Sequence, residues 1–161
     1  MGVTAALYTA LTLLLAPISF GPVQLRIAEA FTMLPLIWHP GVAAVTLGCF
    51  LSNLLGAVMG TAGPIDILIG TLATLIAAQC TWRWRNNLFH GIPVFSILAP
   101  VVINGIMVGA ELAWILNPGK VLQTFPLYCL SVAAGELGAV LLGYLLVRRL
   151  GNRGFFEELE K

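Results

Sequence analysis

Charged residues are scarce in this 161-residue chain. Lys, Arg, Asp and Glu together make up 9% of the residues, against 59% hydrophobic residues, whereas a soluble domain ordinarily carries about 25% charged residues. The net charge of +1 provides no basic surface for a nucleic-acid partner. The composition therefore excludes nucleic-acid binding and predicts an integral membrane protein with the lipid bilayer as its solvent.

Signatures of catalysis and metal binding are also missing. No GxxxxGK[ST] phosphate-binding loop occurs in the sequence, so the chain has no P-loop ATPase of its own. Cys49, Cys80 and Cys129 lie far apart without metal-ligand spacing, and we interpret them as small buried hydrophobes. His39 and His90 fall in predicted turns, as solvated loop histidines do. The sequence therefore predicts no catalytic residue, no metal site and no cofactor.

Apolar segments separated by Pro, Gly and charge clusters predict six transmembrane helices in one all-α membrane domain, residues 1–161. A bilayer core needs about 20 helical residues per span. The predicted helices cover residues 3–17, 25–38, 41–58, 65–84, 92–116 and 121–150. The second is the shortest, at about 21 Å as an α-helix, and it can cross a bilayer only by tilting or by thinning the lipid.

The positions of the arginines predict the orientation of the bundle. Two arginines lie at 83–85, after the fourth predicted helix, and three lie at 148–153, after the sixth. Cytoplasmic loops carry an excess of Lys and Arg, and an even number of helices puts both clusters on the same side. We therefore predict that both termini are inside, and that the loops around Gly21, Gly63 and Gly119 are outside.

Seven polar residues interrupt the apolar helices, and their predicted depths place them in one layer near the outer face. They are Arg26, Glu29, Asn53, Asp66, Asn104, Glu111 and Glu136. Ionisable side chains inside a membrane are costly and mark functional sites. One arginine against four carboxylates leaves a surplus of acceptors, which suits a ligand rich in N–H donors or carrying an ammonium group. The layer is therefore predicted to be a substrate-binding pocket.

Structural roles compete with this interpretation. Arg26 and Glu29 lie one helical turn apart and can form an ion pair. Asp66 can cap the fourth predicted helix. Asn53 and Asn104 can join neighbouring helices by hydrogen bonds. The two remaining glutamates have no cation near them in sequence, so a structural role explains them least well.

A stripe of small residues lies on the first predicted helix. Gly2, Ala6 and Ala10 recur at intervals of four, a spacing that lets another helix approach closely. Residues 135–143 repeat the pattern on the last helix. Packing within the bundle and docking of a partner protein are both compatible with these stripes.

Five segments, in order over nearly the whole chain, hold all seven polar residues. They read GPVQLRIAEAFTMLPL, GCFLSNLLG, DILIGTLATLIAA, VINGIMVGAEL and AAGELGAVLLG. These segments resemble the QueT family of substrate-binding S components of energy-coupling factor transporters. The stripe at Ala6 and Ala10 resembles the S-component motif that docks on the transmembrane coupling subunit.

The resemblance implies a membrane-embedded specificity subunit of an ATP-driven importer in a prokaryotic plasma membrane, not an enzyme. Its partners are then the transmembrane coupling subunit and two ATPase subunits. The implied substrate is a queuosine precursor, 7-aminomethyl-7-deazaguanine or queuine, whose guanine-like edge and amine suit a carboxylate-rich pocket. Arg26 and Glu29 are then expected at the outer rim of this pocket, beneath a lid formed by residues 18–25.

The alternative function is a stand-alone proton-coupled carrier of a small cationic or purine-like solute, with Glu111 or Glu136 as the proton carrier. It needs a proton path to both sides, and the inner half of the predicted bundle has few polar residues. An intramembrane enzyme needs a nucleophile–base pair or metal ligands, and no His or Cys lies in the predicted polar layer. A purely structural membrane subunit would leave carboxylates without partners unexplained.

Overall fold

Seven helices occur in the described residues, 1–20 and 26–151, of this computed structural model. They are α1 (Gly2–Leu14), α2 (Ala16–Ser19), the 3₁₀ helix η1 (Ile27–Leu36), α3 (Gly41–Val58), α4 (Asp66–Arg83), α5 (Val94–Leu116) and α6 (Val121–Gly151). The predicted all-α fold class is confirmed. The last four helices begin and end within two residues of their predicted bounds.

The first predicted helix is shorter than expected. It was predicted over residues 3–17, but α1 ends at Leu14, and Ala16–Ser19 forms the separate short helix α2. The backbone at Leu15 turns away from helical geometry, with φ −104° and ψ 25°. Pro17 lies in the first turn of α2, where its missing N–H costs nothing because the first N–H groups of a helix are unpaired anyway.

The segment predicted as an α-helix over 25–38 is instead the ten-residue 3₁₀ helix η1. A 3₁₀ helix rises about 2.0 Å per residue, so ten residues cover about 20 Å instead of the about 15 Å of an α-helix. Runs longer than three or four residues are uncommon in this conformation. The tighter winding thus lets a short segment traverse more of the bundle than its length predicts.

Arg26 precedes η1 in extended backbone, with φ −89° and ψ 94°. The prediction that it shares a helical turn with Glu29 is therefore wrong. Within η1, Glu29, Thr32 and Pro35 recur every third residue and are all buried, because side chains three apart lie in one row on a 3₁₀ helix.

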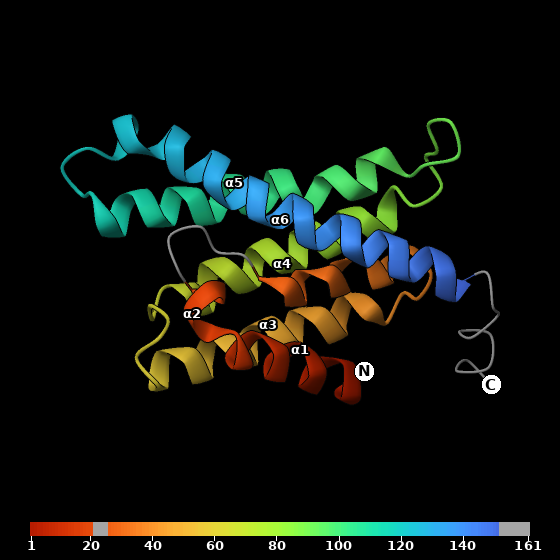
Figure 1. Cartoon of the computed structure of the whole chain (residues 1–161), viewed down its shortest axis with the longest axis horizontal. Coiled ribbons are helices and arrows are strands. Elements are labelled where there is room, and N and C mark those ends of the chain that lie inside the picture. The colour runs from red at the N-terminus through yellow and green to blue at the C-terminus, as the bar shows by residue number, and fades with distance from the viewer. Residues whose placement is uncertain (21–25, 152–161) are drawn as a thin grey trace.

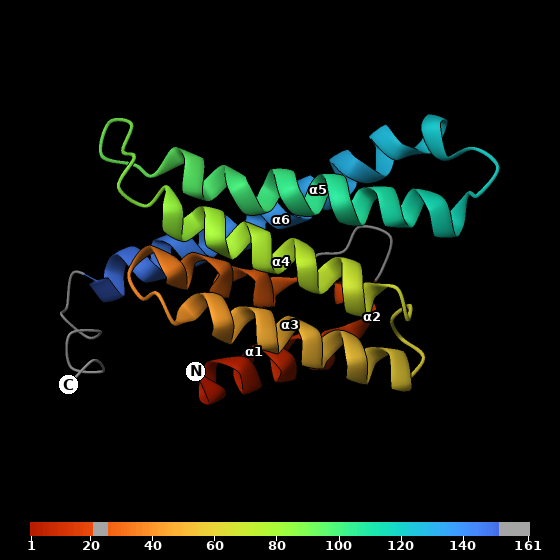
Figure 2. The same ribbon diagram turned by 180° about the vertical axis from the view of Figure 1, so that it is seen from behind.

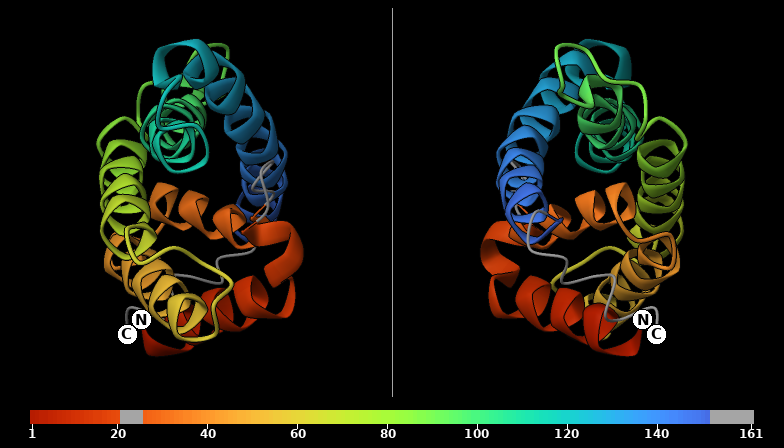
Figure 3. Two further views of the ribbon diagram at one scale, coloured as in Figure 1. Left: turned by 90° about the vertical axis from the view of Figure 1, so that its left-hand side faces the viewer. Right: turned by 90° about the vertical axis from the view of Figure 1, so that its right-hand side faces the viewer.

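The long helices pack around η1. In chain order, α1 packs against α3, α3 against α4, α4 against α5, and α5 against α6, and η1 contacts all five. Viewed along its length, the bundle surrounds η1 (Figure 3). The chain reverses direction between successive long elements, so that Met1, the end of α6 and the loop 84–93 lie at one end of the molecule (Figures 1 and 2). The turns at 59–65 and 117–120 lie at the other end.

The composition of the helices is that of a membrane protein. Among the described residues, α3, α5 and α6 are long and apolar enough to cross a membrane, and α1 and η1 are shorter apolar helices. Large apolar side chains are exposed along the outside of the bundle, for example Leu72 on α4 and Val102 on α5. Water disfavours such a surface, whereas lipid accommodates it.

Glycines allow the closest approaches between helices. At Gly143 of α6 an added Cβ would overlap the carbonyl of Ala30 in η1. At Gly48 of α3 it would lie 2.7 Å from Cβ of Tyr8 in α1. Gly143 belongs to the small-residue stripe at 135–143, so at this position the stripe serves packing within the bundle.

The contact of Gly143 in α6 with Ala30 in η1 leads to a prediction about stability. We expect Gly143→Ala to lower the free energy of unfolding by about 1–3 kcal/mol, because the new methyl group overlaps backbone. Gly138→Ala on the same helix is the matched control, since an added Cβ there meets nothing within 4 Å, and it should be neutral or stabilising by up to about 1 kcal/mol. Thermal unfolding in detergent measures both, and equal stability of the two variants would contradict the contact.

Candidate functional site

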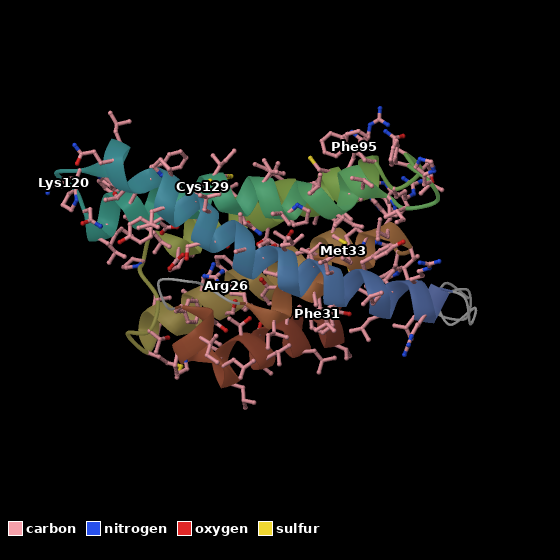
Figure 4. All side chains as sticks on the ribbon, turned by 45° about the horizontal axis from the view of Figure 1, so that its top comes forward. Arg26, Phe31, Met33, Phe95, Lys120 and Cys129 are labelled. Atoms are coloured by element: carbon pink, nitrogen blue, oxygen red, sulfur yellow. The ribbon has the colours of Figure 1, made fainter. Side chains whose placement is uncertain are left out.

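All seven polar residues predicted for the site are buried in the interior of the bundle. Their exposed fractions run from 0% for Asn53 to 7% for Asp66. They come from η1 and the residue before it, and from α3, α4, α5 and α6. The labelled Arg26 lies inside the bundle, between α6 and the helices below it in the view (Figure 4).

Arg26 pairs with Asp66 rather than with Glu29, the partner that the competing structural interpretation gave it. Its Nη2 lies 3.6 Å from Oδ1 of Asp66, the one ion pair among the described residues. Its Nε donates to the carbonyl of Ser19 at 3.2 Å, and its guanidinium lies 4.9 Å from the centroid of the Phe20 ring. Asp66 begins α4 but does not cap it, because its Oδ2 accepts from the Gly63 N–H at 3.3 Å instead.

Glu29 is held by hydroxyl groups. Its Oε1 accepts from Tyr8 Oη at 2.5 Å and from Thr74 Oγ1 at 3.5 Å. Tyr8 lies on α1 and has no exposed surface. The predicted site residues all lie on other helices, and Tyr8 is not among them. A tyrosine in an apolar helix is the available signal, because a buried hydroxyl usually has a hydrogen-bond partner.

Glu136 and Asn104 join α6 to α5. Asn104 Nδ2 donates to Glu136 Oε1 at 2.8 Å. Both residues line a small cavity together with Arg26 and Glu29, and the remaining lining residues are Gly70, Val108 and Val132. The cavity measures about 10 Å³, room for about one water molecule. Four of the predicted site residues therefore meet around one central space.

Cys49 and Asn53 connect Asp66, the partner of Arg26, to Thr74, the partner of Glu29. Asn53 Nδ2 donates to the carbonyl of Asp66 at 2.8 Å and to Cys49 Sγ at 3.4 Å. The same sulfur lies 3.2 Å from Thr74 Oγ1, whose single hydrogen can serve either this sulfur or Glu29 Oε1. Cys49 is buried as predicted, but it also takes part in the polar network, which its sequence context did not indicate. Gly70 leaves room for the network, since a Cβ there would lie 2.7 Å from Asn53 Nδ2.

Unpaired polar atoms are concentrated at the predicted residues. Eight buried side-chain nitrogen and oxygen atoms have no hydrogen-bond partner among the described residues. Six of them belong to predicted site residues: Arg26 Nη2, Glu29 Oε2, Asn53 Oδ1, Asp66 Oδ1 and both carboxylate oxygens of Glu111. Buried polar groups in folded proteins are nearly always hydrogen-bonded. The atoms without a hydrogen bond make these residues the candidates for contact with a polar ligand.

Three further predictions concern a metal site, the small-residue stripe on α1 and the lid. No group of three His, Cys, Asp or Glu residues in the described part of the chain is placed to hold a metal ion. Ala6 and Ala10 are exposed on the outer face of α1, while Ala5 is buried at 1%. Residues 21–25, most of the predicted lid over 18–25, lie outside the described residues.

The fold and the site together define a helical membrane protein with a polar site enclosed by apolar helices. Residues 1–152 match the family described as QueT transporter, and the chain belongs to this family. A similar relative is the queuosine precursor transporter QueT of Lactococcus lactis subsp. cremoris (strain MG1363). It is 26% identical over 165 residues, which cover 95% of this chain and 90% of the relative. No solved structure matches the chain.

The hydrogen bond from Tyr8 to Glu29 leads to a second prediction. Tyr8→Phe leaves Glu29 Oε1 with only the longer contact to Thr74, so we expect a loss of about 1–3 kcal/mol in the free energy of unfolding. Tyr144→Phe is the control, because the Tyr144 ring packs against the core around Met33. Its hydroxyl makes no hydrogen bond within residues 1–20 and 26–151, so about 0.5 kcal/mol or less is expected. Equal losses in the two variants, measured by unfolding in detergent, would refute the role of the hydroxyl.

Proposed function

We propose that this chain is the substrate-binding S component of an energy-coupling factor transporter. In this role it binds a queuosine precursor, 7-aminomethyl-7-deazaguanine or queuine, in the plasma membrane of a prokaryote. The observation that carries the proposal is the concentration of buried polar atoms without a hydrogen-bond partner on Arg26, Glu29, Asn53, Asp66 and Glu111. Membership of the QueT transporter family and the name of the Lactococcus relative support the choice of substrate.

The chemistry of the site suits this ligand. A deazaguanine presents a planar edge of ring N–H and amino groups, and a carboxylate accepts two such hydrogen bonds side by side. Glu29 and Glu136 both line the central cavity. Because that cavity measures about 10 Å³, the surrounding helices must separate to admit a bicyclic base.

We place six membrane crossings in the chain, made by α1 with α2, then η1, α3, α4, α5 and α6, with both termini in the cytoplasm. Arg83 and Arg85 support this orientation, since they lie at the end of α4 and in the loop after it, and this end of α4 is on the same side of the bundle as the N-terminus (Figures 1 and 2). Cysteines introduced at Thr61 and Asn87, both exposed, test it. An impermeant thiol reagent should label intact cells at position 61 and not at position 87, and the reverse pattern would invert the topology.

The coupling subunit is proposed to dock on α1, and two ATPase subunits complete the transporter. Ala6 and Ala10 are exposed on α1 together with Gly2, so a partner helix can approach its backbone closely. The lack of a phosphate-binding loop agrees with ATP hydrolysis in separate subunits.

Ligand binding to the purified chain tests the proposed function directly. We expect queuosine precursors to bind and adenine not to bind. Glu136→Gln should weaken precursor binding by about 10- to 150-fold, the effect of losing a charge-assisted hydrogen bond. Ser131→Ala on the same helix is the control and should bind as the wild type does. Calorimetry measures the affinities, and failure of every precursor to bind the wild type would refute the function.

Substitutions on α1 test the docking face. We expect Ala6→Trp or Ala10→Trp to abolish uptake in cells while the isolated chain still binds ligand, because a bulky side chain keeps a partner helix away from the backbone. Ala110→Trp, at an exposed alanine of α5, should leave uptake unchanged.

Two results would contradict docking on α1. Normal transport and co-purification with the coupling subunit in both α1 variants would place the docking face elsewhere. Loss of ligand binding in both would mean that the stripe packs inside the bundle. Uptake by vesicles containing this chain alone, driven by a pH gradient, would instead favour the proton-coupled carrier.

A further inference from the structure

Glu111 is the least satisfied charged residue of the bundle. It is 3% exposed, and neither of its carboxylate oxygens has a hydrogen-bond partner among the described residues. It follows Asn104 by seven residues on α5, so the two share a face and lie about 10 Å apart along the axis. Val108, between them, lines the central cavity. Glu111 therefore extends the site toward the end of the bundle that holds the turns at 59–65 and 117–120.

Asp66, at the start of α4, lies at the end of the bundle toward which Glu111 extends. Packing brings the start of α4 against the last turn of α5, since a Cβ added at Gly63 would lie 3.9 Å both from Asp66 Oδ2 and from Ile115 Cδ1. Asp66 Oδ1 also lacks a hydrogen-bond partner among the described residues. Ile115 is one turn beyond Glu111 on α5, so the two buried carboxylates lie at the same end of the site. Three of their four oxygens have no hydrogen-bond partner among the described residues, although one of the three, Asp66 Oδ1, lies 3.6 Å from Arg26 Nη2.

The local charges do not balance. Arg26, 3.6 Å from Asp66, can compensate one of the two carboxylates when both are ionised. A buried carboxylate without a partner is strongly unfavourable. An ammonium group supplies both missing elements, because it brings one positive charge and three N–H donors.

The other end of the site has a different character. Glu29 and Glu136 receive hydrogen bonds from the neutral groups of Tyr8, Thr74 and Asn104. The Arg26 guanidinium also lines this narrow cavity and offsets part of its negative charge, and carboxylate acceptors in such surroundings suit the planar N–H edge of an uncharged base. The site is therefore an elongated one, with an acceptor-rich end for a base and an anionic end for a cation.

We propose that Glu111 and Asp66 form an ammonium subsite, and that this subsite makes the protein select substrates that carry a cationic amine beside the base. The inference rests on the proposed function and deepens it. It assigns the amine of a ligand such as 7-aminomethyl-7-deazaguanine to Glu111 and Asp66, and its base edge to Glu29 and Glu136.

Two ligands that differ only at this position test the assignment. One is 7-aminomethyl-7-deazaguanine, and the other is 7-cyano-7-deazaguanine, which has the same base but no amine. We expect the wild type to bind the amine at least about 10-fold more tightly, the effect of one charge-assisted contact. Glu111→Gln should lower the affinity for the amine by about 10- to 150-fold and the affinity for the nitrile by less than about 3-fold. Glu136→Gln, the matched control, should weaken both ligands equally.

The outcomes separate the subsite from the proposed function. If neither compound binds the wild type, the proposed function fails. If both bind the wild type but Glu111→Gln weakens them equally, or leaves both unchanged, the ammonium subsite is wrong and the function stands. Should Glu111→Gln not fold, Asp66→Asn gives the same comparison, and equal effects on both ligands would again overturn the subsite.

Discussion

The charge of Arg26 is the constraint around which the interior of this bundle is arranged. A guanidinium that is 4% exposed among apolar helices needs partners inside the protein, because an unpaired buried charge costs several kcal/mol. Asp66 supplies the countercharge, the Ser19 carbonyl accepts a hydrogen bond, and the Phe20 ring lies against the guanidinium. Arg26 therefore ties the end of α2 to the start of α4, and the remaining carboxylates lie around an already neutralised pair.

The 3₁₀ conformation of η1 places the site at the centre. η1 contacts every long helix, so a residue on it can reach partners on several of them, as Glu29 reaches Tyr8 on α1 and Thr74 on α4. Gly143 allows α6 to lie directly on the backbone of Ala30. The polar groups thus come from many helices, while the apolar outer faces remain in contact with lipid.

The sequence predicted which polar residues are buried better than it predicted their contacts. Asp66, Glu111 and Glu136 are buried in the interior, as charged residues in apolar helices are expected to be, because a charge that faces lipid is costly. Arg26 was given the wrong partner, because its extended backbone breaks the helical spacing on which that pairing depended. Tyr8 was missed because the rotation of α1 about its axis depends on packing against Gly48, which no local pattern encodes.

The surroundings of η1 also bear on its freedom to move. On the side where it faces α1 and α6 lies an apolar space of about 170 Å³, bordered by Leu11, Phe31 and Leu146 among others. A helix that moves into existing space loses fewer van der Waals contacts than a helix that separates from closely packed neighbours. Room for η1 to move is therefore greatest beside Leu11 and Leu146, and least at Ala30, where the backbone of η1 lies directly on Gly143 of α6.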